Sequence, residues 1–322
     1  MLAWILKSDM HTTNYLDELN ATYPIRRTEE QKSAFREYIV SRTSEFGYCS
    51  KVETTADRKN QNVVIGDPAT AKIVLTAHYD TPASAIFPNL MLPRNPLLYY
   101  LCQLLPLFLL VGIALLGGFL ASIPFNKNMG VFLGVYMILY YALFFICYRM
   151  RSNPHNANDN TSGVATVLTA LANADPAHKA SVAAILFDNE EKGKMGSKAY
   201  FKDHQAEMKQ KPVINMDCVG YGEHIIFVAK EAAESDPLYA DLKVAFLQDS
   251  DDYQNHFYPM KGSNANSDYK SFPKGIGCMT CKRSRRGIYY TPHIHTTKDR
   301  YANPANITYI AERLSEFVNQ ID

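Results

Sequence analysis

The sequence predicts an α/β domain of three layers, in which helices flank a central, mostly parallel (mixed) sheet, with a two-helix transmembrane hairpin inserted into it. Two observations predict this fold. Buried, β-branched stretches alternate with helical segments both before residue 94 and after residue 151, and two long uncharged stretches fall between those points. We therefore assign residues 1–93 and 152–322 to two parts of one α/β domain, and residues 94–151 to the inserted hairpin.

The part before the insertion is expected to hold one helix and three strands. Residues 27–47 have the spacing of an amphipathic helix that ends at Gly47, and strands are predicted at 49–55, 61–66 and 72–78. The last strand lies in the run KIVLTAHYD, which is apolar and β-branched, as expected for a strand covered on both faces.

The inserted hairpin is predicted from two uncharged stretches. No residue from Asn95 to Asn126 is charged, and a helix of this length can cross hydrocarbon about 30 Å thick at about 1.5 Å per residue. A second uncharged stretch runs from Asn128 to Tyr148, and a short polar turn around Lys127 joins the two. This order predicts a hairpin that enters and leaves a lipid bilayer on the same side. The alternative is a buried helical hairpin within a globular core.

The charges beside the two stretches predict the orientation of the hairpin. Arg94 precedes the first stretch, and Arg149 and Arg151 follow the second, whereas the connecting turn carries only Lys127. The positive-inside bias therefore predicts an integral protein of the cell membrane whose α/β domain faces the cytoplasm. The apolar run at the N-terminus is too short for the core of a signal peptide, and no small-residue cleavage site follows it, which agrees with this orientation.

After the insertion, helices and strands continue to alternate. Asn303 and Pro304 are the residue types expected at the N-cap and in the first turn of the final helix. Helices are predicted at residues 161–174, 196–205, 237–248 and 304–319, and strands at 181–188, 212–217, 224–229 and 276–281.

The composition argues against a nucleic-acid partner. The chain carries 33 Lys and Arg residues against 32 Asp and Glu residues, so no overall field attracts a polyanion. Its six cysteines lie far apart, which favours reduced thiols, and the lone CxxC pair of Cys278 and Cys281 is expected to be two ordinary thiols. The basic cluster from Lys282 to Arg286 is either a solvated loop or a contact for anionic lipid or for a substrate carboxylate.

Side chains that can bind metal follow the buried strands that the sequence predicts, or lie in loops just before predicted helices. In a largely parallel sheet, functional groups gather where the strands end at their carboxyl side. Taken singly, each of these side chains has a simpler role, such as a helix cap for an aspartate or a core position for a histidine. Their joint occurrence favours one concave metal site. The side chains are His78, Asp80, Asp159, Asp188, Glu190, Glu191, Asp217 and His295.

Six short motifs resemble, in this order, those of the co-catalytic zinc aminopeptidases, a superfamily that also includes the glutaminyl cyclases. The resemblance covers about residues 27–320 apart from the hairpin. It implies a metallopeptidase with a central mixed sheet and two zinc ions bridged by a carboxylate. The motifs are HYD (78–80), NDNTSGVA (158–165), DNEEKGKMGS (188–197), NMD (215–217), SDYKSF (267–272) and HTTKD (295–299).

Carried over position by position, the resemblance implies that Asp159 bridges the two zinc ions. His78 and Asp217 would complete one zinc site, and Glu191 and His295 the other. Three protein ligands for each zinc ion leave room for a shared water that can attack a carbonyl group.

The resemblance also implies roles for three carboxylates around these ligands. Glu190 would be the general base, Asp80 would fix the tautomer of His78, and Asp268 would contact the substrate. It further implies that the peptide bond from Asp159 to the next residue is cis.

The chain departs from the family pattern in two places. Within the fifth motif, the family often has SDHxPF, so Tyr269 and Ser271 differ here. The hairpin is inserted between His78 and Asp159, where relatives have a short loop, and this would hold the predicted site close to the bilayer.

The preferred function is hydrolysis of the N-terminal peptide bond of a peptide substrate. Glutaminyl cyclisation is the enzymatic alternative, and because its best-known members use a single zinc ion, two bound metals would favour the peptidase. A catalytically inactive receptor or membrane scaffold is a further alternative, disfavoured because the five ligands and Glu190 are all present. A transporter is disfavoured because the hairpin carries no charge within its apolar stretches.

Overall fold

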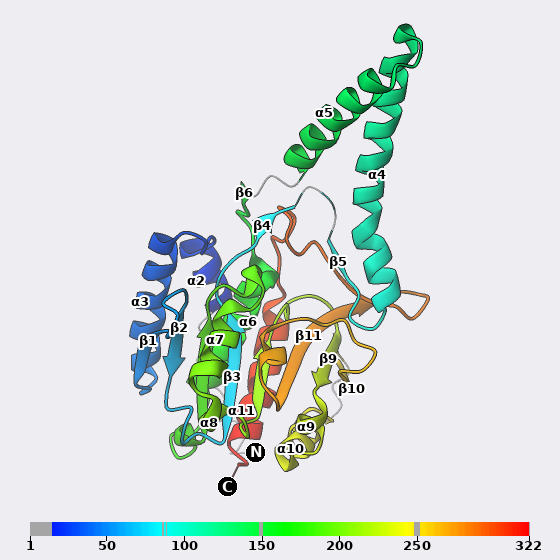
Figure 1. The fold of residues 1–322 in the computed structure, drawn as a ribbon. Helices are drawn as coiled ribbons and strands as arrows, with labels where there is room; N and C mark the ends of the chain where they lie inside the picture. The colour runs from blue at the N-terminus through cyan, green and yellow to red at the C-terminus, as the bar shows by residue number, and fades with distance from the viewer. Residues whose placement is uncertain (1–14, 86, 88, 148–150, 248–251, 322) are drawn as a thin grey trace.

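A mixed sheet of ten strands runs through the α/β domain, and two long helices project from one end of it (Figure 1). The computed structural model describes residues 15–85, 87, 89–147, 151–247 and 252–321. The N-terminal apolar run and Arg149, which entered the predicted orientation, lie outside the described residues. The predicted α/β fold, with helices around a central sheet, is confirmed.

The centre of the sheet consists of four neighbouring parallel strands, in the order β7, β3, β8 and β11. Their bounds are Val182–Phe187, Ile73–His78, Val213–Met216 and Gly275–Arg283. β3 and β7 are buried along their whole length, which explains why their sequences are apolar without alternation. Because the four strands are parallel, their carboxyl ends lie at the same edge of the sheet.

Antiparallel pairs extend the sheet on both sides of this centre. β2 pairs with β7 and β1 pairs with β2, whereas on the other side β9 and β12 pair with β11. β10 runs parallel to β9, and β5 pairs with β12. The bounds are β1 Ser50–Thr54, β2 Gln61–Ile65, β5 Leu90–Met91, β9 His224–Ala229, β10 Gln254–Pro259 and β12 Tyr289–Pro292.

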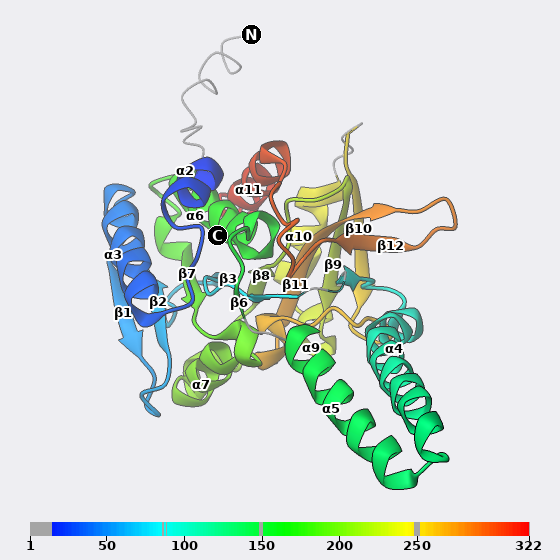
Figure 2. The ribbon, with the colours of Figure 1, turned by 90° about the horizontal axis from the view of Figure 1, so that it is seen from above.

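Helices cover both faces of the sheet (Figure 2). α6 and α11 pack over the larger apolar cluster on one face, and α7 lies on the opposite face, where Tyr200, Met208 and Phe272 belong to a second cluster. The bounds are α2 Tyr15–Thr22, α3 Glu29–Glu45, α6 Gly163–Ala172, α7 Met195–Asp203, α8 Gln205–Met208, α9 Glu231–Glu234, α10 Pro237–Leu247 and α11 Pro304–Val318.

Each predicted helix and strand occurs, with ends that differ by a few residues. The predicted cap of α11 is confirmed, because the side chain of Asn303 accepts a hydrogen bond from the backbone N–H of Ala305 at 3.1 Å. Cys278 and Cys281 lie buried in β11 as free thiols. The sequence does not predict α2, β10 or β12. β10 is half-buried and carries the polar sequence QNHFYP, so it lacks the apolar run that marks the central strands.

The inserted segment forms the two long helices that project from the domain (Figure 1). α4 spans Pro96–Ser122 and continues as a short turn at Ile123–Phe125, and α5 spans Met129–Cys147. Only 17% of the most apolar window of the first helix is buried, and none of that of the second. The two helices are therefore long and apolar enough to cross a membrane, and they are not a hairpin covered by the core of this domain.

A buried ion pair fixes the loop after β7 to α3. The ammonium group of Lys32 lies 2.5 Å from a carboxylate oxygen of Asp188 and 2.8 Å from the side-chain oxygen of Asn189. The second carboxylate oxygen of Asp188 accepts a hydrogen bond from the backbone N–H of Gln61 at 3.2 Å. Since Lys32 and Asp188 are both nearly inaccessible to water, each depends on the other for a charge partner.

We expect Lys32→Ala to destabilise the domain by about 3–5 kcal/mol, because the substitution leaves the carboxylate of Asp188 buried without its cation. Urea unfolding of the wild type and the variant measures the difference. Lys59→Ala, at an exposed position, is the control and should change the free energy of unfolding by no more than about 0.5 kcal/mol. Equal stabilities of the two variants would contradict a structural role for the ion pair.

Candidate metal centre

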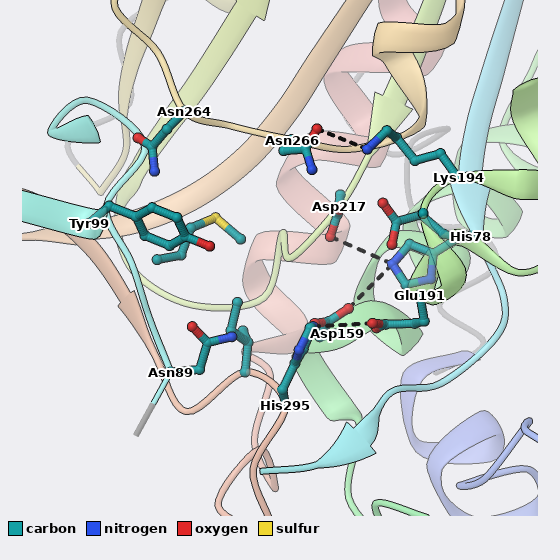
Figure 3. Close-up of a pocket in the computed structure, with 14 residues that line it drawn as sticks. His78, Asn89, Tyr99, Asp159, Glu191, Lys194, Asp217, Asn264, Asn266 and His295 are labelled. Carbon is teal, nitrogen blue, oxygen red and sulfur yellow. Dashed lines mark hydrogen bonds and ion pairs between the residues drawn. The ribbon is translucent and has the colours of Figure 1, made fainter. Parts of the chain in front are cut away.

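The ends of three neighbouring parallel strands carry three of the predicted ligands. His78 is the last residue of β3, Asp217 directly follows β8, and Glu191 lies in the turn after β7. Asp159 comes from the turn that leads into α6, and His295 from the segment after β12. The five side chains converge at the carboxyl edge of the sheet (Figure 3).

The carboxylate of Asp159 lies between the two histidines, and each of its oxygens faces one of them. The Nε2 atom of His78 is 3.3 Å from Oδ1 of Asp159, and the Nε2 atom of His295 is 3.0 Å from Oδ2. His78 Nε2 also lies 3.8 Å from an oxygen of Asp217, and His295 Nε2 lies 3.4 Å from an oxygen of Glu191.

These distances define two groups of three ligand atoms that share Asp159. One group is His78, Asp159 and Asp217, the other is Asp159, Glu191 and His295, and within each group the ligand atoms lie within 4.8 Å of one another. Imidazole nitrogens and carboxylate oxygens are ligands that zinc accepts, commonly three from the protein at a catalytic site. The residues present therefore fit zinc, and the structure brings the five predicted ligands together; their binding of metal stays a prediction.

Asp80 holds both the first histidine and the turn after β7. Its two carboxylate oxygens accept hydrogen bonds from the backbone N–H groups of Glu190 and Glu191, at 2.9 and 3.2 Å. The Nδ1 atom of His78 lies 3.5 Å from the Asp80 carboxylate and 3.1 Å from the Asp80 carbonyl oxygen. Both oxygens near Nδ1 favour a proton there, which leaves Nε2 free to bind metal; the role of Asp80 in fixing this tautomer stays a prediction.

The turn that carries Asp159 is held by residues that the sequence did not single out. The carboxylate oxygens of Asp299 accept hydrogen bonds from the backbone N–H groups of Asn158 and Asp159, at 2.9 and 3.0 Å. The buried guanidinium of Arg26 donates to the hydroxyl of Thr161 at 3.1 Å. The peptide bond from Asp159 to Asn160 is cis, as the resemblance implied. Asp299 is the last residue of the HTTKD motif, so the sequence could have indicated its role. No local sequence pattern indicates a role for Arg26.

The charges of the centre depend on one another. Burial opposes ionisation of Asp159, but the hydrogen bonds and charges of His295 and His78 hold the pKa of that carboxyl well below its usual range. Burial raises the pKa of Glu191 to about 8. Burial also disfavours the charged form of His295, yet Glu191 and Asp159 raise the pKa of that imidazole to about 10.

Two further predicted residues lie beside the ligands. Glu190 lines the pocket and forms a third group of possible ligand atoms with His78 and Glu191, apart from the two groups that share Asp159. Burial raises the pKa of its carboxyl well above its usual range. Asp268 is completely buried next to the centre and does not line the pocket, so its contact with substrate stays a prediction. The basic cluster lies exposed around the turn from β11 to β12, and none of its side chains lines this pocket.

The fold and the ligand set together are those of a zinc metallopeptidase, and comparison with known proteins agrees. The family model "Peptidase family M28" matches residues 148–318, more than half of the chain, and the protein belongs to this family. No curated protein matches the chain at the level of sequence.

Solved structures with the same fold include peptidases and cyclases. A Zn-dependent exopeptidase from Parabacteroides distasonis has a TM-score of 0.60 and 15% identity over 97% of this chain and 99% of that one. The Legionella pneumophila LapA aminopeptidase has a TM-score of 0.57 and 15% identity over 97% and 72%. A glutaminyl cyclase from Porphyromonas gingivalis has a TM-score of 0.56 and 13% identity over 97% and 98%. The family match, together with these folds, confirms the superfamily that the six motifs resemble.

We expect the metal-free protein to lose stability as the pH rises from about 5 to about 8. Burial raises the pKa of Glu191 to about 8 and those of Asp268 and Asp299 to about 7, above the values of unfolded carboxyls. In this window the folded state therefore binds more protons than the unfolded state, and the free energy of unfolding decreases with rising pH.

Zinc should reverse this trend, because it competes with protons for the same ligands and stabilises the folded state by mass action. Melting temperatures at several pH values, with a chelator and with added zinc, measure both slopes. If the melting temperature changes with pH in the same way with the chelator and with zinc, metal does not bind at this carboxylate cluster.

Proposed function

We propose that the protein is a membrane-anchored aminopeptidase that uses two zinc ions to hydrolyse the N-terminal peptide bond of a peptide. The observation that carries this proposal is the position of Asp159, whose two carboxylate oxygens lie 3.3 and 3.0 Å from His78 and His295. A carboxylate with one oxygen directed at each of two ligand groups is suited to bridge a pair of metal ions.

Glu190 is the general base in this proposal. Zinc held by the two ligand groups would polarise the carbonyl of the substrate and lower the pKa of a water molecule there. Glu190 takes one proton from the attacking water while the water oxygen bonds to the carbonyl carbon. It then gives that proton to the leaving nitrogen as the C–N bond breaks. Its raised pKa, caused by burial, suits a group that must both accept and donate a proton near neutral pH.

Glutaminyl cyclisation is the second candidate, because glutaminyl cyclases have the same fold at a TM-score of 0.56, against 0.60 and 0.57 for the peptidases. Likeness of fold does not separate the two reactions. The paired ligand groups favour the peptidase, since both contain complete sets of three protein ligands. The convergence of all five ligands with Glu190 also argues against an inactive scaffold.

The membrane anchor rests on the surface of the hairpin. Its side chains include Leu97, Ile138 and Phe145, which are 74%, 70% and 68% exposed, and this surface is too large and apolar to face water. We further propose that the domain faces the cytoplasm, because Arg94 and Arg151 flank the hairpin on the domain side and the positive-inside bias favours that orientation.

Glu190→Gln should lower turnover by a factor of about 10² or more without loss of bound metal, because the amide cannot accept the proton of water. Release of amino acids from a panel of peptides, with metal content measured on the same samples, tests this expectation. Glu30→Gln on the exposed start of α3 is the control and should keep full activity. Activity of Glu190→Gln near that of the control would remove Glu190 as the base.

The same panel separates the two candidate reactions. A peptidase should release free amino acids and bind two zinc ions per chain, whereas a cyclase should convert only N-terminal glutamine, without cleaving the chain. Cyclisation with no release of amino acids would replace the proposed function by the second candidate.

The anchor and its orientation are tested on sealed membranes. We expect the full chain to require detergent for extraction, and a C-terminal tag to resist protease added to intact spheroplasts until the cells are lysed. Digestion of the tag before lysis would reverse the orientation. A protein that stays in solution without detergent would mean that the hairpin is not an anchor.

A further inference from the structure

One wall of the metal-centre pocket comes from the base of the hairpin. Tyr99, in the first turn of α4, lines this pocket together with Asn89 and Met91 from the segment just before the helix. In Figure 3, Tyr99 lies across the pocket from the metal ligands and directs its hydroxyl into the cavity. The helix that is proposed to enter the membrane therefore also contributes a side chain to the active-site cavity.

Hydrogen bonds fix this wall to the α/β domain. The carbonyl oxygen of Pro93 accepts from the backbone N–H of Asn264 at 3.1 Å and from the hydroxyl of Ser263 at 2.9 Å. The side chain of Gln103 in α4 donates to the side-chain oxygen of Asn89 at 2.8 Å. These contacts join the start of α4 and the loop around residue 264 into one surface.

Asn264 carries an amide that has no partner in the described structure. Both polar atoms of its side chain are shielded from water and make no hydrogen bond with the described residues, and the side chain lines the pocket. A buried polar group without a partner is costly and needs an explanation. The amide has an N–H donor and a carbonyl acceptor, as a peptide group does, so the main chain of a peptide can satisfy both.

The charge of this wall also suits a peptide main chain. The acidic residues that line the pocket are the metal ligands and Glu190, whereas the opposite wall carries Asn89, Tyr99 and Asn264. The only cation among the lining residues outside the histidines is Lys194, which donates to the side-chain oxygen of Asn266 at 2.9 Å. A neutral wall of amides and a phenol favours uncharged polar groups over a charged side chain.

We propose that Tyr99 and Asn264 form a subsite that binds the main chain of the substrate beyond the bond that is cut. The subsite rests on the proposed peptidase function and gives it a substrate class, namely peptides of three or more residues in preference to single aminoacyl amides. The hairpin is then a part of substrate recognition as well as an anchor.

Binding to an inactive protein tests the subsite without relying on turnover. Zinc-loaded, full-length Glu190→Gln protein in detergent is titrated by calorimetry with X-NH2 and with X-Ala-Ala-NH2, where X is the best-bound residue among Leu, Ala, Met and Gln. We expect the longer ligand to bind about tenfold more tightly, because only it can use a hydrogen-bonding partner beyond the first peptide bond.

Single substitutions in this background then locate the contact. Asn264→Leu and Tyr99→Ala should each remove most of the tenfold preference while the affinity for X-NH2 and the zinc content stay unchanged. Asn264→Leu should also raise the melting temperature, because it removes an unpaired buried amide, and loss of a merely structural contact would lower it. Tyr141→Ala is the matched control, since this tyrosine of α5 is 50% exposed and does not line the pocket.

The outcomes separate the subsite from the proposed function. A preference for the longer ligand that survives both substitutions, or the failure of every X-Ala-Ala-NH2 to bind, overturns the subsite. Equal losses for X-NH2 and X-Ala-Ala-NH2 overturn it as well, because the residues would then act on the metal centre. One further outcome is possible: the wild-type protein releases no amino acid, yet the preference for the longer ligand depends on residues 99 and 264. That result overturns the peptidase function and supports the subsite.

Discussion

The carboxylate of Asp159, placed between two histidines, is the contact on which the rest of the site depends. Its two oxygens lie 3.3 and 3.0 Å from His78 and His295, which come from segments more than 200 residues apart in the sequence. The backbone on both sides of this carboxylate is fixed: Asp299 accepts from the N–H group of Asp159, and the Asn160 side chain donates to the carbonyl oxygen of Met216 at 2.9 Å. Because β8 ends at Met216, the last bond ties Asp159 to the strand that presents the next ligand.

The same convergence makes the metal-free centre electrostatically costly. The carboxylates of Asp159, Glu191 and Asp217 are buried within a few ångströms of the two histidines, and burial raises the pKa of Glu191 to about 8. The sheet keeps them together through contacts outside the centre, among them the buried pair of Lys32 and Asp188 and the hydrogen bonds from the turn after β7 to Asp80. Supporting contacts of this kind hold the side chains in position, which is what a preorganised metal centre requires. A divalent cation relieves the electrostatic cost, which explains why ligands that suit zinc can tolerate such burial.

The central strands and the side chains that end two of them were predictable from the sequence for the same physical reason, whereas the assignment of five ligands came from the family resemblance. A buried parallel strand needs an uninterrupted apolar run, and a polar residue at its end marks the functional edge, so His78 and Asp217 are visible in the sequence. β10 was missed because a half-exposed edge strand needs no such run. Arg26 and Tyr99 were missed for another reason: each acts through a tertiary contact with a segment distant in the sequence, and a single chain carries no local pattern for such a contact.

The place of the insertion explains how a hairpin can lie between two ligands without displacing them. Short strands on either side of it, β4 at Ala83–Ser84 and β6 at Arg151–Ser152, pair with each other and close the insertion at its base. The chain before the hairpin is also bonded to the loop that carries the second histidine, since the backbone N–H of Ala85 donates to the carbonyl oxygen of His295 at 2.6 Å. Closure of a long loop costs little more than closure of a short one, so the helices beyond this base can be long without weakening the site. The base also fixes where α4 starts, because β5, which precedes α4, pairs with β12, and β12 leads directly to His295. The hairpin therefore joins the domain beside the pocket, and Tyr99 at its base lines that pocket.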